Sequence, residues 1–336
     1  MVLSLKGDDV AGFEYRIGLA DITGAEVVAL KVVPRYPQTY FEGGVALAAE
    51  EVKRIEKQWQ DEALEVVKQL LTDYDIFEPE FVKDPYPSFS EIRESACPIA
   101  RTERYEGSWL PTRYEDVVAL AQEYEVFTSR GILVMPPPPG QAEGAYGGVA
   151  APPITSDPPD HHWHRRLILP VFAPQAVAKY EQSTRDLCNA LIDEFIDKGV
   201  ADAASDYAQH IPVRVISKML GVPLTMEDEF TDWVRGALEN ITDSERRMKS
   251  FHSIVEYFIG EVQSRAANPR ENDFITELMN TEVEGKKVPI EYVLGVCNLM
   301  LVAGIDTTWS AIGSCMWHLA QHPEHRKQLR ENPDLW

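Results

Sequence analysis

The stretch that decides the fold is Leu301–Gly313, which reads LVAGIDTTWSAIG. It lies inside an apolar segment whose pattern predicts one long helix over 290–321, with Pro289 before it and Pro323 after it. At 1.5 Å per residue such a helix would be about 48 Å long. A helix of that length crosses a whole domain, so we expect the other elements to pack around it.

This helix breaks local preferences at several neighbouring positions. Gly304 costs about 1 kcal/mol relative to alanine in a helix interior. Asp306, if buried without a partner, would cost free energy or titrate with a raised pKa. The hydroxyls of Thr307 and Thr308 can donate back to the carbonyl oxygens one turn earlier, which bends helices. Such conflicts between local preference and fold are expected at functional sites.

The spacing of these residues suggests a shallow groove on the helix. Ala303 and Thr307 lie one turn apart on one face, and Gly304 and Thr308 repeat that pattern beside them. With the Asp306 carboxylate adjacent, the groove could hold a small ligand and pass protons to it. A core helix with a kink and a satisfied Asp–Thr hydrogen bond is an equally good interpretation of this window alone.

A second informative segment is DPPDHHWHRR, residues 157–166. Asp157 is predicted to cap a helix whose first position is Pro158. His161 and Arg165 then lie four residues apart on one face. An arginine fork binds carboxylate or phosphate groups through two hydrogen bonds, so this face suits an anionic ligand.

Two other interpretations of that segment stay open. Arg165 and Arg166 could form a solvated basic face with neighbouring acidic residues. A zinc site built from His161, His162 and His164 is disfavoured, because their spacing is unlike that of known zinc motifs.

Composition excludes several classes of protein. The chain has 336 residues and a net charge of −22, which opposes binding to a nucleic-acid backbone. Its four cysteines are scattered, which is typical of a reducing compartment. The N-terminus lacks the apolar core of a signal peptide, and the apolar run 293–305 is shorter than the roughly 20 residues of a membrane span. We expect a cytoplasmic protein that neither binds nucleic acid nor enters a membrane.

The pattern along the chain predicts a mainly α fold with a small β region. Residues 1–72 read as a short α/β segment of uncertain origin, with a strand at 25–33 and a helix at 44–71. Residues 73–336 form the second predicted domain. Its expected elements are a hairpin turning at Glu106-Gly107, an irregular proline-rich loop over 135–159, and helices at 114–124, 158–172, 174–198, 208–220, 227–240, 244–267, 273–281 and 290–321.

Together, in order, these motifs resemble those of the cytochrome P-450 family of haem-thiolate monooxygenases, in its bacterial form. AGIDTT at 303–308 is similar to the family's AGxDTT segment, and DPPDHHWHRRLILPVFAP at 157–174 is similar to its DPPxHxxxRR…FxP segment. The resemblance covers about residues 74–336. Residues 1–72 weakly resemble part of a universal stress protein domain, without that family's nucleotide-binding glycines.

The resemblance implies a role for each candidate residue. It implies haem b as cofactor and O2 as co-substrate, with one oxygen atom inserted into a small hydrophobic organic substrate. His161 and Arg165 would contact the haem propionates, and Ala303 and Gly304 would form the O2 groove. Asp306 and Thr307 would relay protons as the catalytic residues. A ferredoxin or flavodoxin would supply electrons, and we expect a monomer.

Two family features have no counterpart in this sequence, namely the glycine-rich loop with the axial cysteine and the ExxR pair. Neither Cys97, Cys188, Cys297 nor Cys315 lies in such a motif, so no metal ligand is assigned. We therefore expect a P-450 fold lacking its C-terminal haem-ligand part, and a truncated chain that is inactive as it stands. The alternative is a non-catalytic helical protein that binds small molecules or serves a stress response without haem.

Overall fold

The computed structural model describes residues 4–5, 73–95, 98–131, 145–146, 149–239 and 243–335. The chain divides into two compact units, Met1–Pro136 and Pro137–Trp336, and each is described by itself. The strand predicted at 25–33 and the helix predicted at 44–71 lie outside the described residues. The predicted domain boundary at residue 72 therefore stays a prediction.

The first unit contains short helices and a hairpin. The hairpin strands pair antiparallel with Ala100 opposite Leu110, and Gly107 adopts a positive φ of 90° where the turn enters the second strand. The predicted hairpin is thus confirmed. The elements of this unit are β1 (Ser4–Leu5), α3 (Pro79–Lys83), α4 (Tyr86–Glu94), β2 (Ile99–Thr102), β3 (Ser108–Pro111), α5 (Tyr114–Gln122) and β4 (Phe127–Thr128), which pairs with β1.

The second unit is built from helices, and the predicted mainly α class with a small β region is confirmed. Its only strands among the described residues form two hairpins, β5 (Ala145–Tyr146) with β6 (Val149–Ala150), and β7 (Glu282–Val283) with β8 (Lys286–Lys287). The helices are α6 (Asp160–Ile168), α7 (Pro174–Phe195), α8 (His210–Leu220), α9 (Glu227–Leu238), α10 (Ser244–Ala267), α11 (Phe274–Asn280), α12 (Ile290–Gln321) and α13 (Pro323–Glu331).

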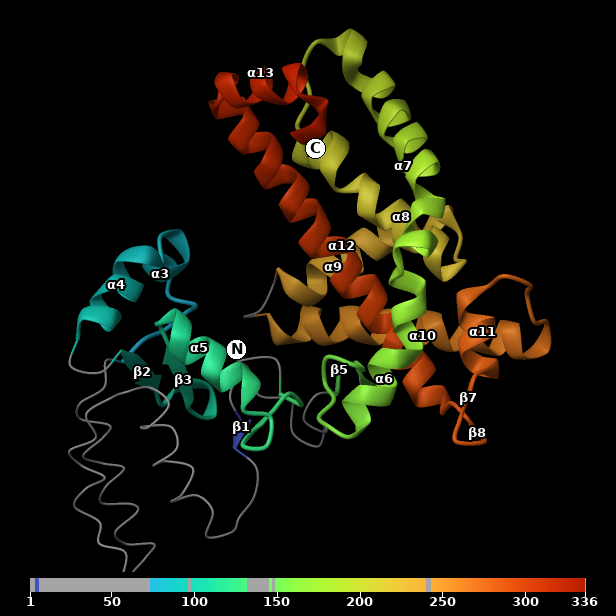
Figure 1. Ribbon diagram of the computed structural model, residues 1–336, viewed down its shortest axis with the longest axis horizontal. Coiled ribbons are helices and arrows are strands. Elements are labelled where there is room, and N and C mark those ends of the chain that lie inside the picture. Colours follow the sequence, from blue (N-terminus) through green and yellow to red (C-terminus); the bar gives the residue numbers. More distant parts are fainter. Residues whose placement is uncertain are drawn as a thin grey trace, which may run out of the picture. The chain divides into compact units, whose positions relative to one another are not determined.

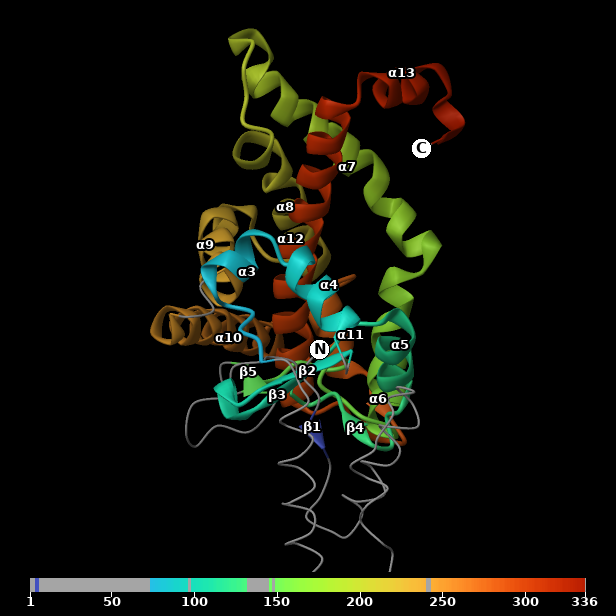
Figure 2. The ribbon, with the colours of Figure 1, turned by 90° about the vertical axis from the view of Figure 1, so that its left-hand side faces the viewer.

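Helix α12 is the centre of the second unit, as predicted. Helices α8, α9, α10 and α11 all contact it, and both views show α10 running across it (Figures 1 and 2). The apolar core joins Val293 and Leu301 of α12 to Leu220 of α8, Val234 of α9 and Phe258 of α10, all of them fully buried. Burial of these side chains is the main driving force for folding this unit.

Two local predictions before α6 are wrong. The helix begins at Asp160, with Pro159 as its cap residue and no side-chain capping bond, and not at Pro158 with an Asp157 cap. An aspartate cap needs a backbone N–H two or three residues on, and proline at 159 removes one of those donors. The loop 135–159 also holds the short hairpin of β5 and β6, because residues 145–150 contain no proline.

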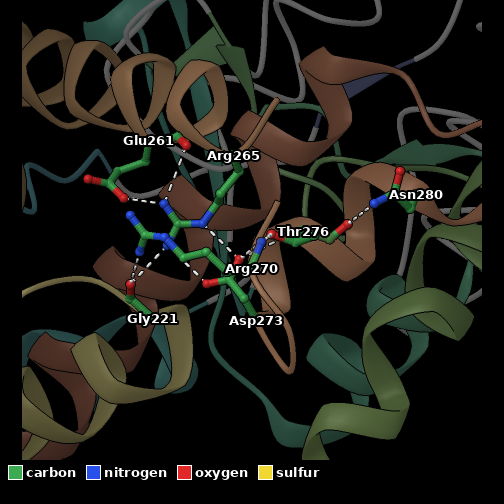
Figure 3. Close-up of polar contacts among 7 residues, drawn as sticks. All are labelled: Gly221, Glu261, Arg265, Arg270, Asp273, Thr276 and Asn280. Atoms are coloured by element: carbon green, nitrogen blue, oxygen red, sulfur yellow. Dashed lines mark hydrogen bonds and ion pairs between the residues drawn. The ribbon is translucent and has the colours of Figure 1, made fainter. Parts of the chain in front are cut away.

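A buried charged network joins three helices in this unit (Figure 3). Arg265 of α10 is 1% exposed and donates to both carboxylate oxygens of Asp273, at 2.7 and 3.0 Å. It also bonds the carboxylate of Glu261, and its Nη2 donates to the carbonyl oxygen of Gly221 at 2.8 Å. Gly221 ends α8 with a φ of +67°. One guanidinium therefore ties the end of α8 and the residue before α11 to α10.

Asp273 is at once the ion-pair partner of Arg265 and the cap of α11. Its Oδ1 accepts from the backbone N–H of Thr276 at 2.9 Å and from the Thr276 hydroxyl at 2.8 Å. Burial by itself would raise the pKa of this carboxyl, but the hydrogen bonds from Arg265 and Thr276 outweigh it and the pKa is lowered. The charged form is therefore the one that the fold stabilises.

We predict that Asp273→Asn lowers the free energy of unfolding by about 3 kcal/mol, because it leaves a buried guanidinium short of its partner. Urea denaturation of the full chain, followed by circular dichroism, measures the loss. The lowered pKa means that the carboxylate stabilises the fold above about pH 3.9, the ordinary value. That contribution disappears as pH falls through the lower folded-state pKa.

Asp232→Asn is the matched control, because Asp232 pairs with Arg246 at 3.0 Å on the surface. We expect it to cost less than about 1 kcal/mol. If Asp273→Asn and Asp232→Asn lowered the free energy of unfolding equally at neutral pH, the buried network would matter no more to stability than a surface ion pair.

Candidate functional site

The two halves of α12 have different environments. Its buried residues run from Tyr292 to Ile305, and every described residue from 306 to 321 is at least partly exposed. Apolar side chains are included, since Trp317 is 66% exposed. The candidate site therefore lies where the helix leaves the core.

The hydroxyl of Thr307 bonds back to the helix, as predicted. Its Oγ1 donates to the carbonyl oxygen of Ala303 at 2.7 Å, and both residues are exposed. Thr308 makes no corresponding bond within the described chain, and α12 continues as an α-helix through both positions. The bond fixes the Thr307 hydroxyl over Ala303 and leaves its oxygen able to accept a further hydrogen bond.

The side chain of Asp306 is only half-buried. It has no hydrogen bond or ion pair with another described residue, so the Asp–Thr bond of the core-helix interpretation is not formed in this structure. This half-exposed carboxylate stands next to the bonded threonine.

Gly304 serves a contact that the sequence analysis missed. A Cβ placed on it would lie 3.1 Å from Cδ1 and 3.2 Å from Cγ1 of Ile216 on α8. The glycine thus admits α8 to the surface of α12, while Ala303 carries the small side chain on the exposed side. A glycine inside a helix is a known signal of close approach, but the sequence does not say what approaches.

Gly295 plays a similar part near the start of α12. A Cβ there would overlap the carbonyl oxygen of Ala150 and lie 2.6 Å from Cδ of Pro152. The segment that leads into α6 is therefore seated directly against the α12 backbone. No local pattern in the sequence marks Gly295 as a contact point.

Helix α6 is anchored to the same end of α12. The Tyr292 hydroxyl donates to the carbonyl oxygen of His164 at 2.7 Å, and the two rings lie 4.8 Å apart. The His164 Nδ1 is 2.7 Å from the Ser156 hydroxyl, and burial lowers the pKa of His164. Trp163 packs on the core beside it. This face of α6 is structural.

His161 and Arg165 lie one turn apart on α6. Arg165 is exposed and His161 is half-buried. Neither side chain forms an ion pair with an acidic residue in the described part of the chain, and the same holds for Arg166. Among the described residues, the acidic partners of the basic-face interpretation are therefore not found, and the Arg165 guanidinium is available to an anionic ligand.

The zinc interpretation of this helix gains no support. Among the described residues, the one group of three or more potential ligands close enough for a metal lies elsewhere, at 322–325. His164 packs against Tyr292, and the rings of His161 and His162 are 6.1 Å apart.

The six predicted site residues are thus placed on two helices of one unit. Ala303, Gly304, Asp306 and Thr307 lie together on α12, where the bond from Thr307 to Ala303 is the polar contact between them. His161 and Arg165 lie on α6, and Tyr292 links the two helices.

The cysteines that the structure describes are not gathered at this site. Cys297 is fully buried, and burial raises the pKa of its thiol to about 12. Cys188 is half-buried on α7 and Cys315 is exposed on α12, while Cys97 lies outside the described residues. A thiol held in its protonated form inside the core is a poor metal ligand.

We predict that Gly295→Ala destabilises the chain by about 1 to 3 kcal/mol, because the new methyl group meets backbone that cannot move aside easily. Gly313→Ala, on the same helix but with no atom within 4 Å of its Cβ, is the control. We expect it to stabilise by up to about 1 kcal/mol. Thermal denaturation of both variants measures whether their stabilities change in opposite directions. A stabilising Gly295→Ala would refute the close contact of Gly295 with Ala150 and Pro152.

The amino-acid sequence of this chain is similar to those of several known proteins. The cytochrome P450 family model matches residues 200–334. The chain is 28% identical to the putative cytochrome P450 YjiB of Bacillus subtilis, over 75% of this chain and 62% of that protein. It is 27% identical to the mycinamicin IV hydroxylase/epoxidase of Micromonospora griseorubida, over 74% of this chain and 62% of that one.

The fold has solved counterparts as well. The structure of cytochrome P450 CYP109Q5 from Chondromyces apiculatus matches with a TM-score of 0.65 and 29% identity, over 78% of this chain and 65% of that one. The chain thus spans roughly three fifths of the length of the curated relatives named above.

Proposed function

We propose that the chain belongs to the cytochrome P450 family and that its protein is a monooxygenase that uses haem b and O2 to hydroxylate a small hydrophobic organic substrate. The observation that carries this proposal is the exposed Ala303–Thr307 face of α12, with its fixed hydroxyl and adjacent carboxylate. A helix that is buried for its first half and open at this point presents these groups to a ligand.

The side chains of α6 fit the anionic edge of haem. The exposed guanidinium of Arg165 would bind one propionate, and the imidazole of His161, four residues earlier on the same helix, would bind beside it. The absence of acidic partners for Arg165 in the described residues supports this assignment. The anchored face of α6, with Tyr292 bonded to His164, holds the helix in place for that contact.

The residues of α12 would provide space and protons. Bound haem supplies the centre at which O2 is reduced and one of its atoms is transferred to the substrate. Ala303 carries only a methyl group on the exposed side and would leave room for O2, whereas the space beside Gly304 is filled by Ile216 of α8. Asp306 would take protons from solvent, and Thr307 would pass them on through its hydroxyl.

We predict that Thr307→Ala lowers the product formed per O2 consumed by at least about tenfold, with hydrogen peroxide released instead, because the proton relay is broken. Thr307→Ser keeps the hydroxyl and is expected to retain most of the coupling. Product, O2 and peroxide are measured together in the protein expressed from its natural gene, with a ferredoxin or flavodoxin as electron donor. If Thr307→Ala still forms as much product per O2 consumed as the wild type, Thr307 is not part of a proton relay.

A haem-binding test separates this function from a non-catalytic one. In the protein from its natural gene we expect a thiolate-type Soret band in the reduced, carbon-monoxide-bound state. Arg165→Ala should weaken haem binding about tenfold. Arg185→Ala, which alters an exposed arginine paired with Glu181 at 2.9 Å on α7, should leave it unchanged.

The 336-residue chain by itself is proposed to be inactive, because its described cysteines all lie within helices α7 and α12 and burial raises the pKa of Cys297. We expect no thiolate-type band from this chain, and such a band would overturn that part of the proposal. A natural protein that binds no haem at all would favour the alternative of a helical small-molecule-binding or stress-response protein.

We propose a monomeric cytoplasmic protein that receives electrons from a ferredoxin or flavodoxin. Helix α12 is long and apolar enough to cross a membrane by length and composition, but half of its most apolar window is buried inside the second unit. That burial supports its role as a core helix.

A further inference from the structure

Three histidines and a glutamate gather where α12 passes into α13. His318 lies in the last turn of α12, His322 caps its end, and Glu324 and His325 lie in the first turn of α13. At 1.5 Å per residue, His318 is about 16 Å along the helix from Thr307. The cluster is therefore separate from the site proposed for haem and O2.

The donor atoms of this cluster come in two close pairs. Nε2 of His318 is 3.0 Å from Nδ1 of His325, and Nδ1 of His322 is 3.0 Å from Oε1 of Glu324. One donor atom each from His322, Glu324 and His325 also lie within 4.8 Å of one another. The ring of His325 stacks on those of His318 and His322 at centroid distances of 5.1 and 4.9 Å, and the His318 and His322 rings lie tilted at 4.3 Å.

The backbone holds these side chains in place. His318 and His322 are four residues apart, so they share a face at the end of α12. Pro323 then starts α13 and turns Glu324 and His325 back toward that face. The Arg326 guanidinium bonds the carbonyl oxygens of Leu319 and Ala320, the latter at 3.0 Å, which fastens α13 to the end of α12.

The geometry points to a binding site for a divalent transition metal of the zinc class, with His322, Glu324 and His325 as ligands and His318, 3.0 Å from His325, as a neighbouring fourth donor. In a tetrahedral site with metal–nitrogen distances of 2.0–2.1 Å, neighbouring ligand atoms are about 3.3 Å apart. Both close pairs come near that separation. Three imidazoles with one carboxylate suit zinc, copper or nickel better than magnesium or calcium.

A bound metal would explain why three imidazoles stack at one point. A metal ion would accept a lone pair from a ring nitrogen of each ligating histidine. The ion would cross-link the last turn of α12 to the first turn of α13. This site is independent of haem and of the proposed reaction.

We test the site with zinc chloride and the metal-free 336-residue chain, by isothermal titration calorimetry at pH 7.5. One Zn²⁺ should bind per chain. His322→Ala and His325→Ala should each weaken binding by about a hundredfold or more, since even changes in outer-shell partners cost 10- to 100-fold. Co²⁺ in place of Zn²⁺ should give the visible absorption of a four-coordinate site.

His252→Ala is the matched control, because His252 is an exposed histidine on α10, outside the cluster. It should leave affinity and stoichiometry unchanged. His325→Gln, which keeps a polar side chain of similar size, guards against a loss caused by misfolding, and circular dichroism checks helix content. No Zn²⁺ binding, or equal binding by the wild type and the His322 and His325 variants, would overturn the proposal.

Discussion

The burial of the first half of α12 is the constraint on which the second unit depends. Val293, Leu301 and Ile305 are fully buried among the side chains of the surrounding helices, and the helix then continues with no described residue buried. An apolar helix that is packed at one end and open at the other gives a rigid base and an accessible surface on the same element. Thr307 and Asp306 stand at the beginning of that open part, so their position follows from where the core ends.

The charged network around Arg265 holds the packing partners of α12 together. A single guanidinium reaches Asp273 just before α11, Glu261 of α10 and the carbonyl oxygen of Gly221 at the end of α8. A buried pair of this kind need not add net stability relative to an apolar core, but it is costly to break. It therefore specifies how these helices join, while the apolar side chains supply most of the driving force.

The two ends of α12 are fastened differently. At its start, the Tyr292 hydroxyl donates to the backbone of α6, and the segment before α6 packs against Gly295. These two contacts fix the position of α6, the helix that carries His161 and Arg165. At its far end, Arg326 binds carbonyl oxygens of α12, and the histidine cluster surrounds the junction with α13. Figure 1 shows α6 and α13 at opposite ends of α12. The groups proposed for haem and for a metal ion are kept apart by the length of this helix.

The sequence by itself determined the features that depend on near neighbours in the chain. The bounds of α12 follow from its flanking prolines, the Thr307 bond spans one helical turn, and His161 shares a face with Arg165 through simple helix spacing. Only the tertiary structure decided that Gly304 meets Ile216 and that Gly295 meets the loop at Ala150. Helical periodicity marks which residues face inward but not which distant segment they meet, because that depends on how all the helices pack at once.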